Sequence, residues 1–209
     1  MIKEACVQTF DEALIAQQNG ADRIELCSRL DLDGLTPSRN LIRSVKSKLT
    51  IPIKIMIRPR AGDFVYNDQE IEQMKNDILF CNSLKVFGVV FGVLTKENSI
   101  DIETSRKLAD ISSVIDITFH KAIDQVKSII SELDKLKNIS NVSSVLTSGG
   151  ADNAKTGSKL IKTMINKVGD RMVIIPAGKI TKQNLNEIHS LIGANEYHGR
   201  KIVDISKLN

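Results

Sequence analysis

Short apolar segments alternate with longer amphipathic segments along the whole chain. The short segments have about the length of an average strand. Several are rich in Ile and Val, as expected for parallel strands that helices cover. They predict strands at Ile2–Cys6, Arg23–Cys27, Ile53–Arg58, Gly88–Phe91, Asp116–His120, Ser143–Ser148, Met172–Ile175 and Asn195–His198. The helical spacing of apolar residues between them predicts helices at Thr9–Gln18, Ser38–Leu49, Asp68–Leu84, Glu103–Ala109, Val126–Leu136, Asn153–Lys167 and Thr181–Leu191.

Residues at the ends of the predicted helices support this assignment. Thr9-x-x-Glu12 is a capping-box pattern. Asp68 has the side chain of an N-cap and precedes an apolar pattern of helical period. Gly20 and Gly193 follow two of the predicted helices, where glycine commonly ends a helix.

Strict alternation of strands and helices predicts a parallel sheet with right-handed crossovers. Eight strands favour an α/β fold of the TIM-barrel type, a closed (β/α)8 barrel that spans residues 1–209 as one domain. An open dinucleotide-binding sheet is disfavoured, because no Gly-x-Gly-x-x-Gly follows the first strand. Only eleven residues follow His198, so we expect the last helix to be missing or vestigial.

A missing last helix would expose apolar sheet surface between the first and last units. Exposed apolar patches tend to become interfaces, and two-fold pairing is the commonest closed assembly. The sequence therefore predicts a homodimer with Lys201–Asn209 near the contact. In the alternative, the tail folds back as a short helix through its apolar residues, which are Ile202, Val203, Ile205 and Leu208.

The composition is that of an ordinary soluble domain, with 42% apolar and 26% charged residues. The 29 basic and 25 acidic residues give a net charge of +4. The basic residues are scattered along the chain, so we expect no nucleic-acid partner. No segment approaches about 20 consecutive apolar residues, which predicts no membrane span. The chain begins without an apolar targeting segment and has three cysteines, Cys6, Cys27 and Cys81. We expect these to be thiols in a reducing cytoplasm.

Polar residues gather where the predicted strands end, which is where barrels of this type place their active sites. The first two strands end in Glu4-Ala-Cys6 and Glu25-Leu-Cys27, and the period of two puts each Glu and Cys on one face. We expect these faces to point into the barrel. A candidate acid–base or anion-binding set consists of Glu4, Glu25, Arg58, His120 and His198. The alternative is a satisfied structural network of buried charges.

Two glycine-containing loops follow the sixth and seventh strands. Late loops of a barrel often bind phosphate through backbone N–H groups, which makes a candidate anion site of Ser148, Gly149, Gly150 and Gly178. Lys179 would add a cation. In the alternative, these glycines only allow tight turns between strand and helix.

Cys6 and Cys27 allow a different function. Two thiolates on adjacent strands suit a soft ion such as Cu(I). Zinc is less well supported, because no standard ligand spacing is present. The alternative is that both cysteines are small buried residues without a ligand, which is also what we expect of Cys81 in the middle of a helix.

A series of motifs resembles the CutC copper homeostasis protein family, in order and over nearly the whole chain. They are Gly20–Ser28 (GADRIELCS), Gly34–Ser38 (GLTPS), Met56–Arg60 (MIRPR), Gly62–Tyr66 (GDFVY), Val89–Thr95 (VVFGVLT), Thr118–His120 (TFH), Leu146–Ala151 (LTSGGA) and Tyr197–Gly199 (YHG).

The resemblance implies a barrel fold, a cytoplasmic role in copper handling, and Cu(I) binding at the cysteines that match Cys6 and Cys27. The chain departs from the family pattern at Lys121, at Pro176–Lys179 and at Arg200. From the resemblance as a whole, we expect a Cu(I)-binding copper homeostasis protein. Two alternatives remain open: a barrel enzyme acting on a small anionic or phosphorylated substrate, and an interaction scaffold that uses the flank near the last strand.

Overall fold

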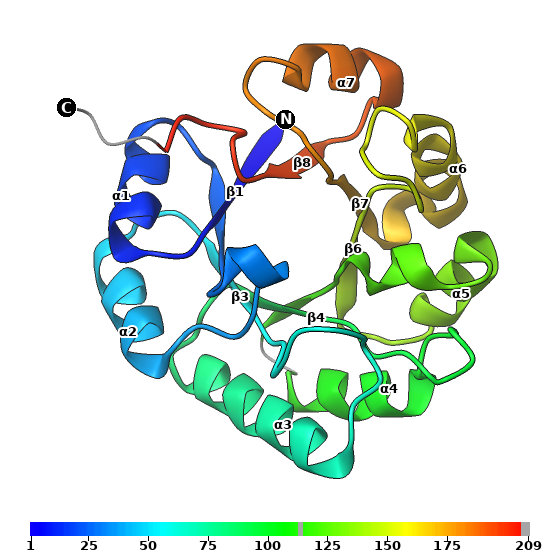
Figure 1. Ribbon diagram of the computed structural model, residues 1–209, viewed down its shortest axis with the longest axis horizontal. Coiled ribbons are helices and arrows are strands. Elements are labelled where there is room, and N and C mark those ends of the chain that lie inside the picture. Colours follow the sequence, from blue (N-terminus) through cyan, green and yellow to red (C-terminus); the bar gives the residue numbers. More distant parts are fainter. Residues whose placement is uncertain (113–114, 206–209) are drawn as a thin grey trace.

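In the computed structural model, the described residues are 1–112 and 115–205. They form a ring of eight parallel strands with helices around it (Figure 1). The strands are β1 (Ile2–Val7), β2 (Arg23–Leu26), β3 (Ile53–Met56), β4 (Gly88–Phe91), β5 (Asp116–Phe119), β6 (Val142–Thr147), β7 (Val173–Pro176) and β8 (Glu196–Gly199). The α-helices are α1 (Phe10–Gln18), α2 (Arg39–Lys48), α3 (Asp68–Ser83), α4 (Ile102–Ile111), α5 (Ile129–Leu136), α6 (Ser158–Val168) and α7 (Leu185–Ile192). The predicted TIM barrel is confirmed.

The barrel is nearly closed. Hydrogen-bonded neighbours follow the order β7-β6-β5-β4-β3-β2-β1-β8. β7 and β8 lie side by side (Figure 1), and no ladder joins them within the described residues. A parallel bridge between Thr181 and Lys201 links the segments that follow these two strands.

The strand register sets which side chains share a layer inside the barrel. Cys6 on β1 lies opposite Glu25 on β2. Glu4, two residues earlier, lies opposite His198 on β8. Because side chains alternate along a strand, Glu4 and Cys6 point to the same side. The register thus places Glu4 and His198 one layer deeper than Cys6 and Glu25.

The starts of α1 and α3 show which residues form the N-caps. The Thr9 hydroxyl accepts a hydrogen bond from the Glu12 backbone N–H (3.1 Å), which confirms it as the N-cap of α1. For α3 the predicted cap, Asp68, is one residue late. Asn67 accepts from the Glu70 N–H (2.9 Å), and the Glu70 carboxylate accepts from the Asn67 N–H (2.8 Å).

Three predicted helices begin later than the sequence pattern suggested. α5 begins at Ile129, and a 3-10 helix (Lys121–Gln125) precedes it. α7 begins at Leu185. α6 begins at Ser158, because the preceding loop packs on the turn after β6: a Cβ on Gly157 would lie 1.9 Å from the Ser148 carbonyl oxygen. The residues that precede these three helix starts therefore belong to the loops after β5, β6 and β7, at the carboxyl ends of the strands.

The segment after β8 folds back over the flank between α7 and α1 (Figure 1). Ile202 and Val203 are buried, and Ile205 packs against the core. The segment therefore folds back as the alternative prediction for the tail stated, but residues 202–205 are irregular chain and not a helix. Leu208 lies outside the described residues. The homodimer expected from an open flank stays a prediction. Among the described residues, no helix combines the length and apolar character needed to cross a membrane.

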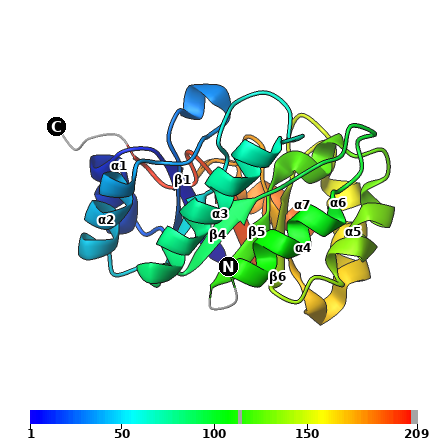
Figure 2. The same cartoon turned by 90° about the horizontal axis from the view of Figure 1, so that it is seen from below.

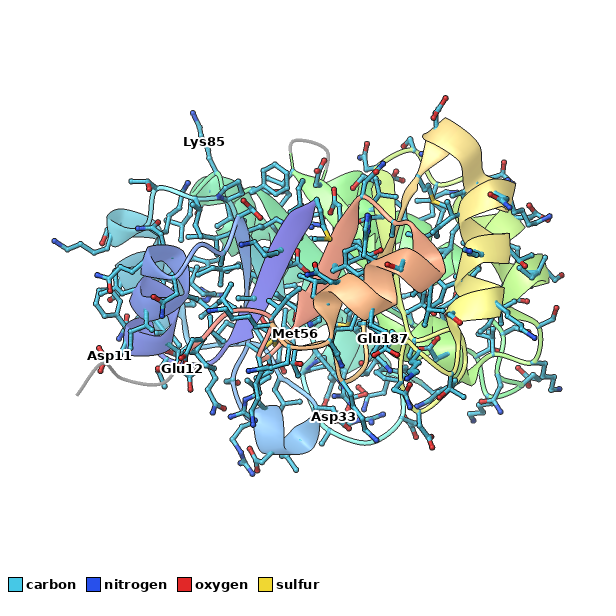
Figure 3. The ribbon with its side chains drawn as sticks, turned by 90° about the horizontal axis from the view of Figure 1, so that it is seen from above. Asp11, Glu12, Asp33, Met56, Lys85 and Glu187 are labelled. Carbon is cyan, nitrogen blue, oxygen red and sulfur yellow. The ribbon has the colours of Figure 1, made fainter. Side chains whose placement is uncertain are left out.

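The loops that follow the strands gather at one end of the barrel (Figure 2). A short 3-10 helix (Leu30–Leu32) rises there between β2 and α2. Figure 3 shows Asp33 beside this helix and Lys85 at the opposite end of the molecule. The end marked by Asp33 is the one at which barrel enzymes and binding proteins place their sites.

Candidate functional site

The deepest polar layer of the barrel is a network of paired charges. The Glu4 carboxylate accepts from Arg23 Nε (2.5 Å), and Arg23 also pairs with Glu196. Lys54 Nζ lies 4.0 Å from Glu4 and donates to the hydroxyl of Thr118 (2.7 Å). Burial alone would raise the pKa of Glu4, but Lys54, the hydrogen bond with His198 and Arg23 together lower it well below its usual range. Glu4 is therefore a carboxylate held by structural partners.

Sequence reasoning identified Glu4 but missed Arg23, Lys54 and Glu196. The signal was present in the strand period, because Arg23 stands two residues before Glu25 and Lys54 two residues before Met56 on inward-facing positions. Burial lowers the pKa of the Lys54 ammonium, although Glu4 opposes that shift.

The two predicted Glu-x-Cys pairs both point into the barrel. The sulfur atoms of Cys6 and Cys27 lie 3.8 Å apart, and Cys27 Sγ lies 3.5 Å from Glu25 Oε2. One ligand atom from each of Cys6, Glu25 and Cys27 lies within 4.8 Å of the others. All three residues are buried. This is a compact set of donor atoms of the kind that holds a metal ion.

His198 connects this set with the charged layer below. Its Nδ1 lies 2.8 Å from Glu4 Oε1, and its Nε2 lies 3.6 Å from Glu25 Oε2. Burial would lower the pKa of His198, but Glu25 and hydrogen bonds with Cys6 and Glu4 raise it well above its usual value. His198 therefore brings a positive charge to the thiols.

The four groups around the sulfur atoms differ in protonation. A hydrogen bond from Cys27 lowers the pKa of Cys6 to about 5, against the effect of burial. The same hydrogen bond, together with burial, raises the pKa of Cys27. Burial also raises the pKa of Glu25 to about 8. These shifts favour a Cys6 thiolate beside a His198 imidazolium.

Above the thiols a cavity of about 370 Å³ opens toward the loop end of the barrel. It is lined by Cys6, Glu25, Cys27, Asp33, Met56, Arg58, Gly62, Phe64, His120, Lys121, Asp124, Gln125, Leu146 and His198. Met56 belongs to one apolar cluster with both cysteines, and Figure 3 labels it inside the barrel. Sequence reasoning missed Met56, whose thioether is a further soft donor.

The structure divides the five predicted acid–base residues into three places. Glu4 belongs to the deep charged layer, whereas Glu25 and His198 lie beside the thiols. Arg58 and His120 form a group with Phe64 in the cavity wall. The Phe64 ring centroid lies 4.8 Å from Arg58 Cζ and 4.7 Å from the His120 ring centroid.

The turn after β6 binds a carboxylate of the protein itself. The Asp124 side chain accepts from the N–H groups of Ser148 (2.9 Å) and Gly150 (2.9 Å), and the Gly149 N–H donates to Thr147 Oγ1 (2.8 Å). The predicted anion site at these three residues is therefore corrected: their backbone donors are already engaged. Asp124 was missed, because it lies 24 residues before Ser148 and no local motif connects them.

Gly178, the fourth member of that predicted anion site, serves close packing instead. It has φ = +97°, and a Cβ there would lie 3.1 Å from Asn153 Cα and from Ser148 Cβ. This matches the alternative reading of the glycine loops as tight turns.

Comparisons with known proteins agree with the fold and with the family resemblance of the sequence. The copper homeostasis protein cutC homolog of Homo sapiens is 42% identical over 197 residues, which are 94% of this chain and 72% of that protein. A CutC family protein of Mesorhizobium japonicum is 35% identical over 202 residues, 97% of this chain and 78% of the relative.

Solved structures extend the comparison. The crystal structure of the CutC protein from Streptococcus agalactiae superposes with a TM-score of 0.92 at 29% identity, covering 97% of this chain and 100% of that chain. A dihydrodipicolinate synthase from Cyanidioschyzon merolae, at 12% identity and a TM-score of 0.67, shares the fold alone; the match covers 95% of this chain and 69% of that one. The model of the CutC family matches residues 1–203. With eight parallel strands and the expected motifs at their ends, the chain belongs to the CutC family.

Proposed function

We propose that this protein binds one Cu(I) ion through Cys6 and Cys27 and serves copper homeostasis. The observation that carries the proposal is the 3.8 Å separation of the two sulfur atoms. With metal–sulfur bonds of about 2.3 Å, that separation corresponds to a sulfur–metal–sulfur angle of roughly 110°. A single ion can therefore contact both sulfurs without movement of the strands, and its bent geometry leaves room for a third ligand.

The surroundings of the thiols favour a soft ion over a hard one. Met56 and Val90 belong to one apolar cluster with both cysteines, and Leu30 packs against that cluster, so the sulfur atoms have apolar neighbours on one side. Thiolates and thioethers select Cu(I), whereas Mg²⁺ and Ca²⁺ prefer oxygen ligands. Glu25 is a weak competitor for a soft ion, because carboxylate oxygen is a hard ligand and burial raises the pKa of this carboxyl. Met56 is the third ligand that we favour.

The charges around the thiols support the binding of a single cation. Cys6 provides a thiolate, and the His198 imidazolium balances its charge. Cys27 loses its proton when the ion binds, since a thiolate and not a thiol is the metal ligand. This chemistry requires reduced thiols, which places the proposed function in a reducing compartment such as the cytoplasm.

A competition titration tests the proposal. The full chain, titrated with Cu(I) against a chromophoric chelator without oxygen, is expected to bind one equivalent. The Cys6→Ser/Cys27→Ser double variant is expected to lose that equivalent. Cys81→Ala is the matched control, because Cys81 lies in α3 away from the other two thiols. Binding that survives in the double variant would falsify the site.

A further inference from the structure

A buried guanidinium lies in the cavity wall, and none of the described carboxylates pairs with it. Arg58 is only 4% exposed. Its Nη1 donates to the carbonyl oxygens of Leu32 (3.0 Å) and Gly34 (3.2 Å), and its Nη2 donates to that of Gly62 (2.9 Å). Within the described part of the chain its Nε–H has no hydrogen-bond partner. Buried charges in proteins are ordinarily paired, so this donor fits an anion that comes from outside the chain.

His120 supplies a second donor of the same kind. Its Nδ1 accepts a hydrogen bond from the Ala122 N–H (3.2 Å), which places the ring proton on Nε2. Nε2 is buried and has no partner among the residues that the structure describes. Burial and the nearby Arg58 also lower the pKa of His120 to about 3, so the ring stays neutral. Nε2–H is a fixed donor at every physiological pH.

Packing holds both donors in place. Phe64 contacts both the guanidinium and the imidazole. A Cβ at Gly92 would lie 2.6 Å from His120 Nδ1, so the glycine lets the ring lie against the end of β4. Small-molecule sites depend on a few polar groups that are fixed in this way within an otherwise apolar wall.

We propose that this cavity binds a small organic carboxylate that also carries a hydroxyl or carbonyl oxygen. Arg58 Nε–H and His120 Nε2–H donate to the two carboxylate oxygens. Two donors and one unpaired positive charge match a carboxylate, whereas phosphate brings more charge and more acceptor atoms than they satisfy. The volume of about 370 Å³ is near the lower end of the range for ligand pockets, about 300–1,000 Å³. The ligand is therefore small.

Glu25 provides the contact for the second oxygen. Its Oε1 is buried in the same cavity without a partner among the described residues. The two acidic groups near the mouth do not oppose the carboxylate strongly: Asp33 is exposed, and Asp124 is engaged by the turn after β6 and by Lys121 (3.3 Å). The ligand contacts use neither sulfur atom, although both cysteines line the same cavity, so the site goes beyond the proposed copper function.

Calorimetric titration of the full chain tests the ligand class. The probes are L-lactate, L-malate and pyruvate, with propionate and inorganic phosphate for comparison. We expect at least one of the first three to bind more tightly than both comparison probes, because propionate lacks the second oxygen. Phosphate binding more tightly than every carboxylate would overturn the assignment, as would a lack of binding by all three at millimolar concentration.

Two substitutions of one residue separate the donor from the packing. His120→Asn keeps an acceptor near the position of Nδ1 and removes the Nε2 donor, whereas His120→Gln keeps an N–H donor near Nε2. We expect His120→Asn to weaken binding of the best probe roughly tenfold or more, and His120→Gln to weaken it less. Equal binding by wild type and a His120→Asn variant that melts normally would refute the role of His120.

Two controls keep this result apart from copper binding. Arg60→Lys is the matched arginine control, because the Arg60 guanidinium pairs with Asp63 and Glu70 outside the cavity; it should leave the affinity for the probe unchanged. The Cys6→Ser/Cys27→Ser variant should also keep carboxylate binding. Loss of the carboxylate in that double variant would contradict a site that does not need the sulfur atoms.

Discussion

Polar side chains inside the barrel fall into two groups according to their partners. Glu4 and Arg23 contact opposite charges on neighbouring strands, and Lys54 donates to hydroxyl groups. Arg58 and His120 each keep a donor that no described residue uses. A satisfied network stabilises the fold, whereas an unused buried donor costs free energy until a ligand binds it. This difference separates a satisfied deep layer from the mouth, where we propose that a ligand binds.

The buried neutral state of His120 predicts how stability depends on pH. Its pKa in the folded protein is about 3, whereas an unfolded histidine titrates near pH 6.5. As the pH falls below 6.5, the unfolded chain takes up a proton that the folded protein does not. This contribution to stability is therefore present above pH 6.5 and is lost in acid. Between pH 6.5 and 5.5 the loss is about 1 kcal/mol.

Urea unfolding at these two pH values measures the effect. Wild type should lose about 1 kcal/mol more than His120→Asn over the same interval, because asparagine does not titrate. The comparison concerns the difference between two pH values, so a general destabilisation by the substitution does not enter it. An identical loss in both proteins would show that the pKa of His120 is the same in the folded and unfolded protein.

At the scale of elements, the alternation of short apolar and longer amphipathic segments predicted most of the strands and helices, and the residues at helix ends supported the assignment. The period of two along β1 and β2 placed Glu4, Cys6, Glu25 and Cys27 on inward positions, and the structure agrees. Helix starts were less predictable. The loop before α6 is set by the contact of Gly157 with Ser148, and Asp124 fills the turn after β6. Such contacts join loops that are distant in sequence, and no local pattern specifies them.

The start of α3 gives a test at this scale. Asn67, and not Asp68, forms the reciprocal capping box with Glu70. Asn67→Ala should lower the free energy of unfolding by about 1 kcal/mol. Asp68→Ala should cost less, since it removes only a favourable charge near the helix start. Thermal or urea unfolding of the two variants decides the matter, and a larger loss for Asp68→Ala would argue against this cap.

At the scale of the whole molecule, closure of the barrel creates pairs that sequence alone could not identify. Glu4 meets His198 across 194 residues, and Arg23 meets Glu196 across 173. The sequence predicted eight strands and therefore a closed ring, but the register of β1 against β8 decides which residues face each other. The pairing of β3 with β2 brings Met56 to the two cysteines. Some of the site residues could be named in advance, whereas their grouping depended on the register.

X-ray absorption at the copper edge of the Cu(I)-loaded protein tests the central claim most directly. The account predicts two or three sulfur neighbours at about 2.3 Å, two of them lost in the Cys6→Ser/Cys27→Ser variant. Met56→Leu should then remove the third. A copper environment made of nitrogen and oxygen, or one that the double substitution leaves unchanged, would contradict a copper site at the paired cysteines of β1 and β2.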